Sequence, residues 1–120
     1  MPLRVGIDLI EVAAVEEAIS AHGERYLARV YTERERADCG DAPERLAARF
    51  AAKEAALKVL RPEADAPPWR TIEVRRDPGG WIELALSGRA AELADAAGIR
   101  ELALSVTHEG GRASAVVVAT

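Results

Sequence analysis

The sequence predicts an α+β domain with a mainly antiparallel sheet and one long central helix. Residues 45–60 contain neither Gly nor Pro and are rich in Ala, Leu, Arg, Lys and Glu, which favours one uninterrupted helix. Two pairs of strand-like segments, 71–75 with 81–86 and 101–107 with 113–119, are each separated by a Gly-rich turn and predict two β-hairpins. Helices combined with hairpins are typical of an α+β architecture.

Length and composition limit the classes of protein to consider. A chain of 120 residues can bury one hydrophobic core, so we expect a single domain over residues 1–120. The net charge of −4 argues against a general nucleic-acid binder, which usually carries a basic surface. Cys39 is the only cysteine, so the chain has no disulfide framework and no thiolate metal site. Because no signal peptide or apolar run of about 20 residues is found, we expect a cytoplasmic protein without membrane contact.

The first segment, residues 3–10, has the composition of a β-strand. Gly6 weakens that pattern, and a glycine inside a strand indicates close approach by another part of the backbone. The side chain of Asp8 points opposite to those of Ile7 and Leu9, because side chains alternate along a strand. This carboxylate is either exposed on a half-buried strand or part of a site.

Helices are expected between the first strand and the long helix. Residues 11–21 have the spacing of an amphipathic helix. Thr32 and Glu35 form a capping-box pattern, which predicts a short helix that ends near Gly40. Asp41 has N-cap chemistry, so we expect the long helix to begin just after it.

The second half of the chain contains the two hairpins. A proline-rich loop is expected at 61–68, and residues 77–80 (Asp-Pro-Gly-Gly) are a strong turn signal within the first hairpin. Ser87 is suited to cap a helix over 88–97. Residues 115–119 are all apolar, so we expect the last strand to be central and buried.

The long helix carries a distinctive set of charges. Arg45, Arg49 and Lys53 are spaced i, i+4, i+8 and line one side, an unfavourable row that an anion alongside would relieve. Glu54 lies beside these cations, and Lys58 lies one turn beyond it. The charges form either an ordinary solvated face or a phosphate and metal site.

The polar residues favour phosphate chemistry over other kinds of catalysis. Asp8 and Glu54 offer the oxygen ligands that Mg²⁺ prefers, and Mg²⁺ shares its shell with substrate phosphates. His108 is either a satisfied polar residue at a strand end or a contact to a phosphate or base. A Gly-x-Ser-x-Gly elbow, a P-loop and a dinucleotide fingerprint are all absent.

Four segments resemble one known family. They are residues 5–11 (Val-Gly-Ile-Asp-Leu-Ile-Glu), 32–35 (Thr-Glu-Arg-Glu), 49–55 (Arg-Phe-Ala-Ala-Lys-Glu-Ala) and 104–109 (Leu-Ser-Val-Thr-His-Glu). On these motifs, which cover nearly the whole chain in the right order, the sequence resembles the holo-acyl-carrier-protein synthases, the short 4′-phosphopantetheinyl transferases. The resemblance implies the fold of that family.

The resemblance also implies a reaction and roles for residues. The 4′-phosphopantetheine arm of coenzyme A moves to a serine of an apo acyl carrier protein, and 3′,5′-adenosine bisphosphate is released. Asp8 and Glu54 are implied to hold Mg²⁺, with Glu54 deprotonating the serine directly or through a metal-bound water. Lys58 is implied to neutralise or protonate the leaving phosphate. The residues implied to bind coenzyme A are Arg49, Lys53, Lys58, Thr107 and His108.

The family resemblance further implies a homotrimer with active sites between neighbouring subunits. Two departures from the family concern the docking of the carrier protein. The family has an arginine soon after the position of Glu11, where this chain has uncharged residues at 12–15, and a proline in the turn where this chain has residues 79–81 (Gly-Gly-Trp). A specialised or secondary-metabolism carrier is therefore an open alternative. The cations that would attract an acidic carrier, or else are plain surface charges, are Arg25, Arg29, Arg34 and Arg36.

Two other functions remain as alternatives. One is a non-catalytic module on the same fold that binds coenzyme A or a carrier protein, and the other is a nucleotide-phosphate binding domain unrelated to carriers. The joint presence of Asp8, Glu54 and Lys58 favours the enzyme, because a binding module needs no such set.

Overall fold

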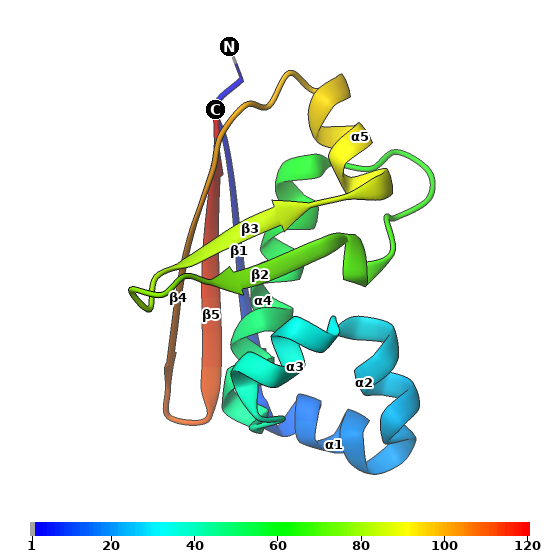
Figure 1. Cartoon of the computed structure of the whole chain (residues 1–120), viewed down its shortest axis with the longest axis vertical. Helices are drawn as coiled ribbons and strands as arrows, with labels where there is room; N and C mark the ends of the chain where they lie inside the picture. The colour runs from blue at the N-terminus through cyan, green and yellow to red at the C-terminus, as the bar shows by residue number, and fades with distance from the viewer. Residues whose placement is uncertain (1) are drawn as a thin grey trace.

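Two antiparallel sheets and one long helix form the framework of the structure (Figure 1). The computed structural model describes residues 2–120. The elements are β1 (Arg4–Glu11), α1 (Val12–His22), α2 (Glu24–Val30), α3 (Glu33–Cys39), α4 (Pro43–Leu60), the 3₁₀ turn η1 (Trp69–Thr71), β2 (Ile72–Arg76), β3 (Ile82–Leu86), α5 (Gly88–Ala96), β4 (Leu102–Glu109) and β5 (Arg112–Ala119).

The larger sheet has the strand order β1-β5-β4, so the apolar last strand lies in the centre as expected. Both of its pairings are antiparallel, and the register places Asp8 opposite Ala115 and Ala115 opposite Val106. β2 and β3 form a separate antiparallel hairpin. The α+β architecture with a mainly antiparallel sheet is therefore confirmed.

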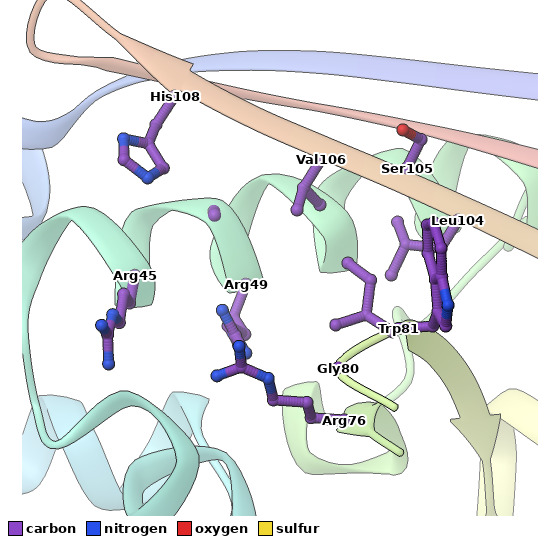
Figure 2. A pocket seen from close by; sticks show the side chains of 11 residues that line it. Arg45, Arg49, Arg76, Gly80, Trp81, Leu104, Ser105, Val106 and His108 are labelled. Atoms are coloured by element: carbon purple, nitrogen blue, oxygen red, sulfur yellow. The ribbon is translucent and has the colours of Figure 1, made fainter. Parts of the chain in front are cut away.

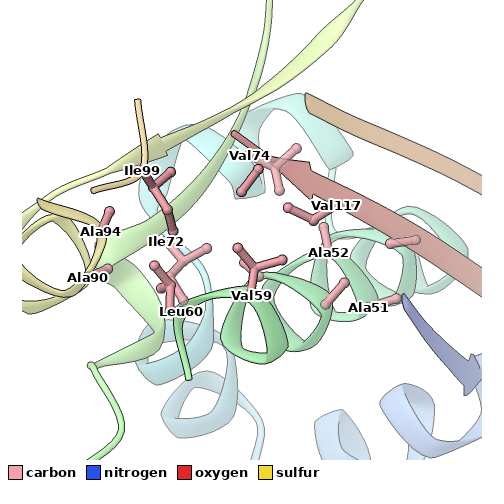
Figure 3. Close-up of a cluster of buried hydrophobic side chains, with 14 residues drawn as sticks. Ala51, Ala52, Val59, Leu60, Ile72, Val74, Ala90, Ala94, Ile99 and Val117 are labelled. Carbon is pink, nitrogen blue, oxygen red and sulfur yellow. The ribbon is translucent and has the colours of Figure 1, made fainter. Parts of the chain in front are cut away.

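Helix α4 packs across one face of the larger sheet, and small side chains allow a close approach. Ala51, Ala52 and Ala55 of this helix have no exposed surface and belong to a buried cluster with Val117 of β5 (Figure 3). On β1, a Cβ atom at Gly6 would lie 2.1 Å from the carbonyl oxygen of Ala55. The close backbone approach that Gly6 indicated is therefore an approach by α4.

Helices α1, α2 and α3 lie together near the N-terminal end of α4, and α5 lies at the opposite end of the molecule (Figure 1). The capping box at the start of α3 is present as predicted. The Glu35 amide donates to the Thr32 hydroxyl at 3.1 Å, and the Thr32 amide donates to the Glu35 carboxylate at 2.9 Å. This helix ends at Gly40, which has a φ of +58°.

Two helix starts differ from the sequence-based prediction. Glu11 belongs to β1 and does not begin α1, since it pairs with Arg112 of β5 and its carboxylate lies 3.1 Å from the Arg112 Nε atom. Asp41 does not cap α4, whose N-cap residue is Ala42. The Asp41 carboxylate instead binds the Arg36 guanidinium at 3.0 Å.

In the part of the chain that the structure describes, no helix or strand covers the face of the larger sheet that is turned away from α4. Successive side chains of β1 alternate between the two faces, and Val5, Ile7 and Leu9, which point away from α4, are apolar. Val5, Ile7 and Leu9 are each more than 60% exposed, and Val118 of β5 is 37% exposed. We call these four residues the outer sheet face. Among residues 2–120, no helix has the combination of length and apolar character needed to cross a membrane.

Candidate active site

Asp8, Glu54 and Lys58 lie together where β1 crosses α4. The four-residue spacing places Glu54 and Lys58 on the same side of α4, and the packing at Gly6 brings Asp8 of β1 toward them. The Lys58 ammonium lies 3.6 Å from the Asp8 carboxylate and donates a 2.7 Å hydrogen bond to the Ile7 carbonyl. The structure thus brings together the three residues predicted to be catalytic, which we call the carboxylate cluster.

The surroundings of Glu54 change its acidity. Burial raises the pKa of the Glu54 carboxyl, the negative charge of Asp8 raises it further, and Lys58 acts in the opposite direction. A carboxylate with a raised pKa is a stronger proton acceptor, as a general base requires.

The two carboxylates also fit a divalent cation. Their charges repel each other, and Mg²⁺ is commonly bound by one or two carboxylates together with waters and substrate phosphates. Residues 2–120 contain no group of three or more His, Cys, Asp or Glu side chains arranged to hold a metal. An ion at Asp8 and Glu54 would therefore take its remaining ligands from a substrate and from water.

A second group of side chains lines a cavity of about 410 Å³ bounded by α4, the β2–β3 turn and β4 (Figure 2). Its cationic residues are Arg45 and Arg49 from α4 and Arg76 from the end of β2, and His108 from β4 lies beside them. Arg49 is only 8% exposed, and its buried Nε atom has no hydrogen-bond partner in the described part of the chain. We call this space the arginine cavity.

The arginine cavity is suited to an anion. Among residues 2–120, no acidic side chain forms an ion pair with Arg45, Arg49 or Arg76. A buried N–H group without an acceptor is unfavourable, and phosphate oxygens accept hydrogen bonds from guanidinium groups in a bidentate geometry. The charges thus favour a phosphorylated ligand.

The cavity also has an apolar part. Its lining includes Trp81, Leu104 and Val106. In Figure 2, Arg45 and His108 lie toward one side of the cavity, and Trp81 and Leu104 lie toward the other. This separation fits a ligand that has phosphates at one end and an apolar, flat group at the other.

Lys53 does not join the arginine cavity, and this part of the sequence-based prediction is corrected. Its side chain has no exposed surface, and its ammonium lies 2.8 Å from the Glu35 carboxylate. It also donates hydrogen bonds to the carbonyl groups of Trp69 and Ile72. Burial lowers the pKa of Lys53, while the charge of Glu35 raises it. Lys53 is thus a structural residue that ties α4 to α3 and β2.

The predicted phosphate-binding residues separate in the structure. Arg49 and His108 meet in the arginine cavity, whereas Thr107 lies on the opposite face of β4 from His108 and does not line the cavity. Sequence reasoning did not assign Arg76 or Trp81 to the site. Their only signal was the position of a cation and an aromatic residue on either side of the turn at 77–80.

The carboxylate cluster and the arginine cavity lie at opposite edges of the larger sheet. Asp8 belongs to β1 and His108 to β4, and β5 separates these two edge strands. Glu54 and Lys58 follow the β1 side of α4, and none of the three cluster residues lines the arginine cavity. One copy of the chain therefore presents the carboxylate cluster and the arginine cavity as two separate groups of polar side chains.

Known proteins resemble this chain in sequence and in structure. It is 43% identical over 123 residues to the holo-[acyl-carrier-protein] synthase of Herpetosiphon aurantiacus, with 97% of each chain covered. It is 46% identical over 132 residues to the protein of the same name from Chloroflexus aggregans, with 95% of this chain and 92% of that relative covered.

Solved structures with the same fold include two complexes. Helicobacter pylori holo-[acyl-carrier-protein] synthase in complex with coenzyme A matches with a TM-score of 0.85 and 28% identity, over 98% of this chain and 100% of that one. The Chronobacterium ammoniagenes ACPS–CoA complex matches with a TM-score of 0.87 and 33% identity, over 99% and 97% of the two chains. The family model of the 4′-phosphopantetheinyl transferase superfamily matches residues 4–111. The chain therefore belongs to the 4′-phosphopantetheinyl transferase superfamily.

Proposed function

We propose that this chain is a holo-[acyl-carrier-protein] synthase. It transfers the 4′-phosphopantetheine arm of coenzyme A to a serine hydroxyl of an apo acyl carrier protein and releases 3′,5′-adenosine bisphosphate. The observation that carries the proposal is the presence, in one chain, of a carboxylate cluster suited to proton transfer and an arginine cavity suited to a nucleotide phosphate. The function of the relatives named above agrees with this pairing.

The carboxylate cluster supplies the groups for the transfer. The serine oxygen attacks the β-phosphorus of coenzyme A, and the bond from this phosphorus to the adenosine bisphosphate oxygen breaks. Glu54 accepts the proton of the serine hydroxyl, for which its raised pKa is suited. Lys58 provides a positive charge one helical turn away, where it offsets the charge that develops on the leaving phosphate.

We also propose that Asp8 and Glu54 hold Mg²⁺. When bound there, the ion stabilises negative charge on the pyrophosphate oxygens. Asp8 has a further role within the chain, because its carboxylate attracts the Lys58 ammonium and keeps it beside Glu54. The arginine cavity holds the phosphates of the adenosine end through Arg49 and His108.

A homotrimer would join the carboxylate cluster and the arginine cavity, which we therefore call the two half-sites. We propose that the carboxylate cluster at the β1 edge of one copy completes a site with the arginine cavity at the β4 edge of a neighbouring copy. The separation of the half-sites supports this assembly, as does the outer sheet face, which leaves Ile7 62% exposed. A contiguous apolar surface of this kind is usually covered by a partner. A closed ring of identical copies provides that cover.

The carrier protein is proposed to dock on α2 and not on α1. Helix α1 contains neither Lys nor Arg, and its exposed Glu16 and Glu17 would repel an acidic carrier. Arg25 and Arg29 of α2 line a shallow cavity and carry the positive charge that α1 lacks. Arg36 is already paired with the carboxylates of Glu24 and Asp41.

We place the enzyme in the cytoplasm, where its donor coenzyme A is available.

Intact-mass measurement on a small panel of apo carriers tests the function directly. Incubation with coenzyme A and Mg²⁺ is expected to increase the mass of at least one carrier by one phosphopantetheine group. Glu54→Gln is expected to retain coenzyme A binding and lose the transfer. Coenzyme A binding without transfer to any carrier by the unaltered chain would instead support a non-catalytic binding module.

A further inference from the structure

Trp81 is 78% exposed, although tryptophan carries a large apolar ring. The backbone around it is fixed by the β2–β3 turn. The Trp81 carbonyl accepts a 2.8 Å hydrogen bond from the Asp77 amide, and the Trp81 amide donates to the Asp77 carboxylate at 3.0 Å. Gly80 allows the turn through its φ of +88°. The turn thus holds Trp81 in a defined place without burying its ring.

Packing within the chain does not explain this tryptophan. In the described part of the chain, the aromatic ring pairs are Tyr26 with Tyr31 and Phe50 with Trp69, and Trp81 has no aromatic partner. Its neighbours are the lining residues of the arginine cavity. An exposed, well-positioned indole ring at the rim of a cationic cavity is a suitable surface for a planar group of a charged ligand.

We propose that Trp81 is the stacking surface for the adenine base of coenzyme A. The inference rests on the proposed function and adds a residue that determines specificity for the donor. With phosphates held by Arg49 and its cationic neighbours, the base of the same nucleotide reaches the apolar side of the cavity, where Trp81 and Leu104 lie (Figure 2). Stacking on an aromatic ring requires only the flat face of the base.

Fluorescence can report on Trp81 separately, because the chain contains only two tryptophans. The other, Trp69, packs against Phe50 with ring centroids 5.1 Å apart. In the Trp69→Phe protein, Trp81 is the remaining indole. Addition of 3′,5′-adenosine bisphosphate is expected to quench its fluorescence, and inorganic pyrophosphate, which has no base, is expected to leave it unquenched.

Kinetics provide a second readout. Trp81→Ala is expected to raise the KM for coenzyme A and the Kd for 3′,5′-adenosine bisphosphate about tenfold, with little effect on kcat, since a stacked base contributes binding and not chemistry. Trp81→Phe is expected to restore most of the affinity because it restores a ring. Glu83→Ala, an exposed change on the same hairpin, serves as the matched control.

The outcomes separate this inference from the function on which it rests. If Trp81→Ala binds the nucleotide as tightly as the unaltered chain while Arg49→Met weakens binding, the stacking role is wrong and the nucleotide site stands. Equal quenching by pyrophosphate and by the nucleotide would also overturn the stacking role. If Arg49→Met and Trp81→Ala both bind normally and no carrier is modified, the proposed function itself fails.

Discussion

Gly6 of β1 touches the backbone of Ala55 in α4, and no side chain fits between them. A Cβ atom at residue 6 would lie 2.1 Å from the Ala55 carbonyl oxygen and 3.1 Å from the Lys58 Cβ atom. Asp8 follows two residues later on the same face of β1, and Glu54 precedes Ala55 on α4. This contact therefore sets the separation of the two carboxylates.

We predict that Gly6→Ala destabilises the chain by about 1–3 kcal/mol or more, because the added methyl group meets backbone that must shift. The shift also moves Asp8 away from Glu54, so transfer activity falls more than the loss of folded protein explains. Urea unfolding and intact-mass assays measure the two effects. Glu109→Ala, at the exposed end of β4, is the control that leaves both unchanged.

The buried pair of Lys53 and Glu35 predicts a strong effect on stability. Lys53→Met leaves the Glu35 carboxylate buried without its cation, so we expect the free energy of unfolding to fall by about 3–5 kcal/mol. A double variant, Lys53→Met with Glu35→Gln, removes both charges and is expected to recover part of this loss. Denaturant unfolding of the unaltered chain, the single variants Lys53→Met and Glu35→Gln, and the double variant gives the coupling energy. Equal stability of Lys53→Met and the unaltered chain would contradict the assignment.

Substitution of Arg49, one turn before Lys53, is expected to affect the binding of coenzyme A and not the stability of the chain. Arg49→Met removes a buried guanidinium whose Nε atom lacks an acceptor, so the free energy of unfolding is expected to stay constant or to rise. The KM for coenzyme A is expected to rise by at least about tenfold, since a charged hydrogen bond to phosphate is lost. Unfolding curves and steady-state kinetics on one preparation test both statements. A large loss of stability together with a normal KM would show that Arg49 is structural.

The raised pKa of Glu54 predicts how stability changes with pH. The folded chain holds this proton to a higher pH than the unfolded chain, so the contribution to stability is present below the ordinary carboxyl pKa and is lost as the pH rises through the folded value. Glu54→Gln cannot lose a proton there. Its stability relative to the unaltered chain is therefore expected to rise as the pH increases from about 4, the ordinary pKa of a glutamate, through the raised pKa of the folded chain.

Metal binding at the same residue provides an independent check. Mg²⁺ is expected to raise the melting temperature of the unaltered chain at neutral pH, because a ligand that binds the folded state stabilises it. Glu54→Gln is expected to lose this response. A Mg²⁺ effect of equal size in both proteins would show that the ion binds elsewhere.

Assembly can be tested through the outer sheet face and through mixed subunits. Ile7→Glu places a charge on the apolar face and is expected to yield monomers by light scattering, with loss of transfer activity. Glu54→Gln and Arg49→Met damage different half-sites. Equal amounts of the two variants, unfolded together and refolded, are expected to regain about one quarter of the sites, since an intact cluster must meet an intact cavity from a neighbour. The assay uses coenzyme A well below the raised KM of Arg49→Met, where sites that carry this substitution contribute little. No recovery would contradict a shared site.

Much of the fold was predictable because local signals agreed with it. The capping box at Thr32, the turn at 77–80 and the apolar run at 115–119 each depend on nearby residues, and the structure confirms all three. Asp41 was misleading because its carboxylate has another partner, an arginine five residues earlier in the chain. Its carboxylate binds Arg36, and α4 begins after Ala42 instead.

The site was predictable only in part, because helical spacing does not show which face is covered. Arg49 and Lys53 have the same charge and lie four residues apart, yet Arg49 faces a cavity and Lys53 is enclosed by Glu35 and the backbone of residues 69–72. Trp81 lines the cavity because the β2–β3 hairpin packs near α4 and β4, and this packing cannot be read from the local sequence. The pairing of Lys53 with Glu35 likewise depends on how α3 and α4 pack together.

Glu35 has a consequence for how the domain unfolds. One carboxylate accepts the amide of Thr32 at the start of α3, pairs with Lys53 of α4 and accepts the amide of Val74 in β2 at 2.8 Å. The helical end of the molecule and the first strand of the hairpin therefore cannot separate without breaking the same set of bonds. The amide protons of Thr32 and Val74 should exchange slowly and with the same free energy of opening, that of global unfolding, and the whole chain should melt cooperatively.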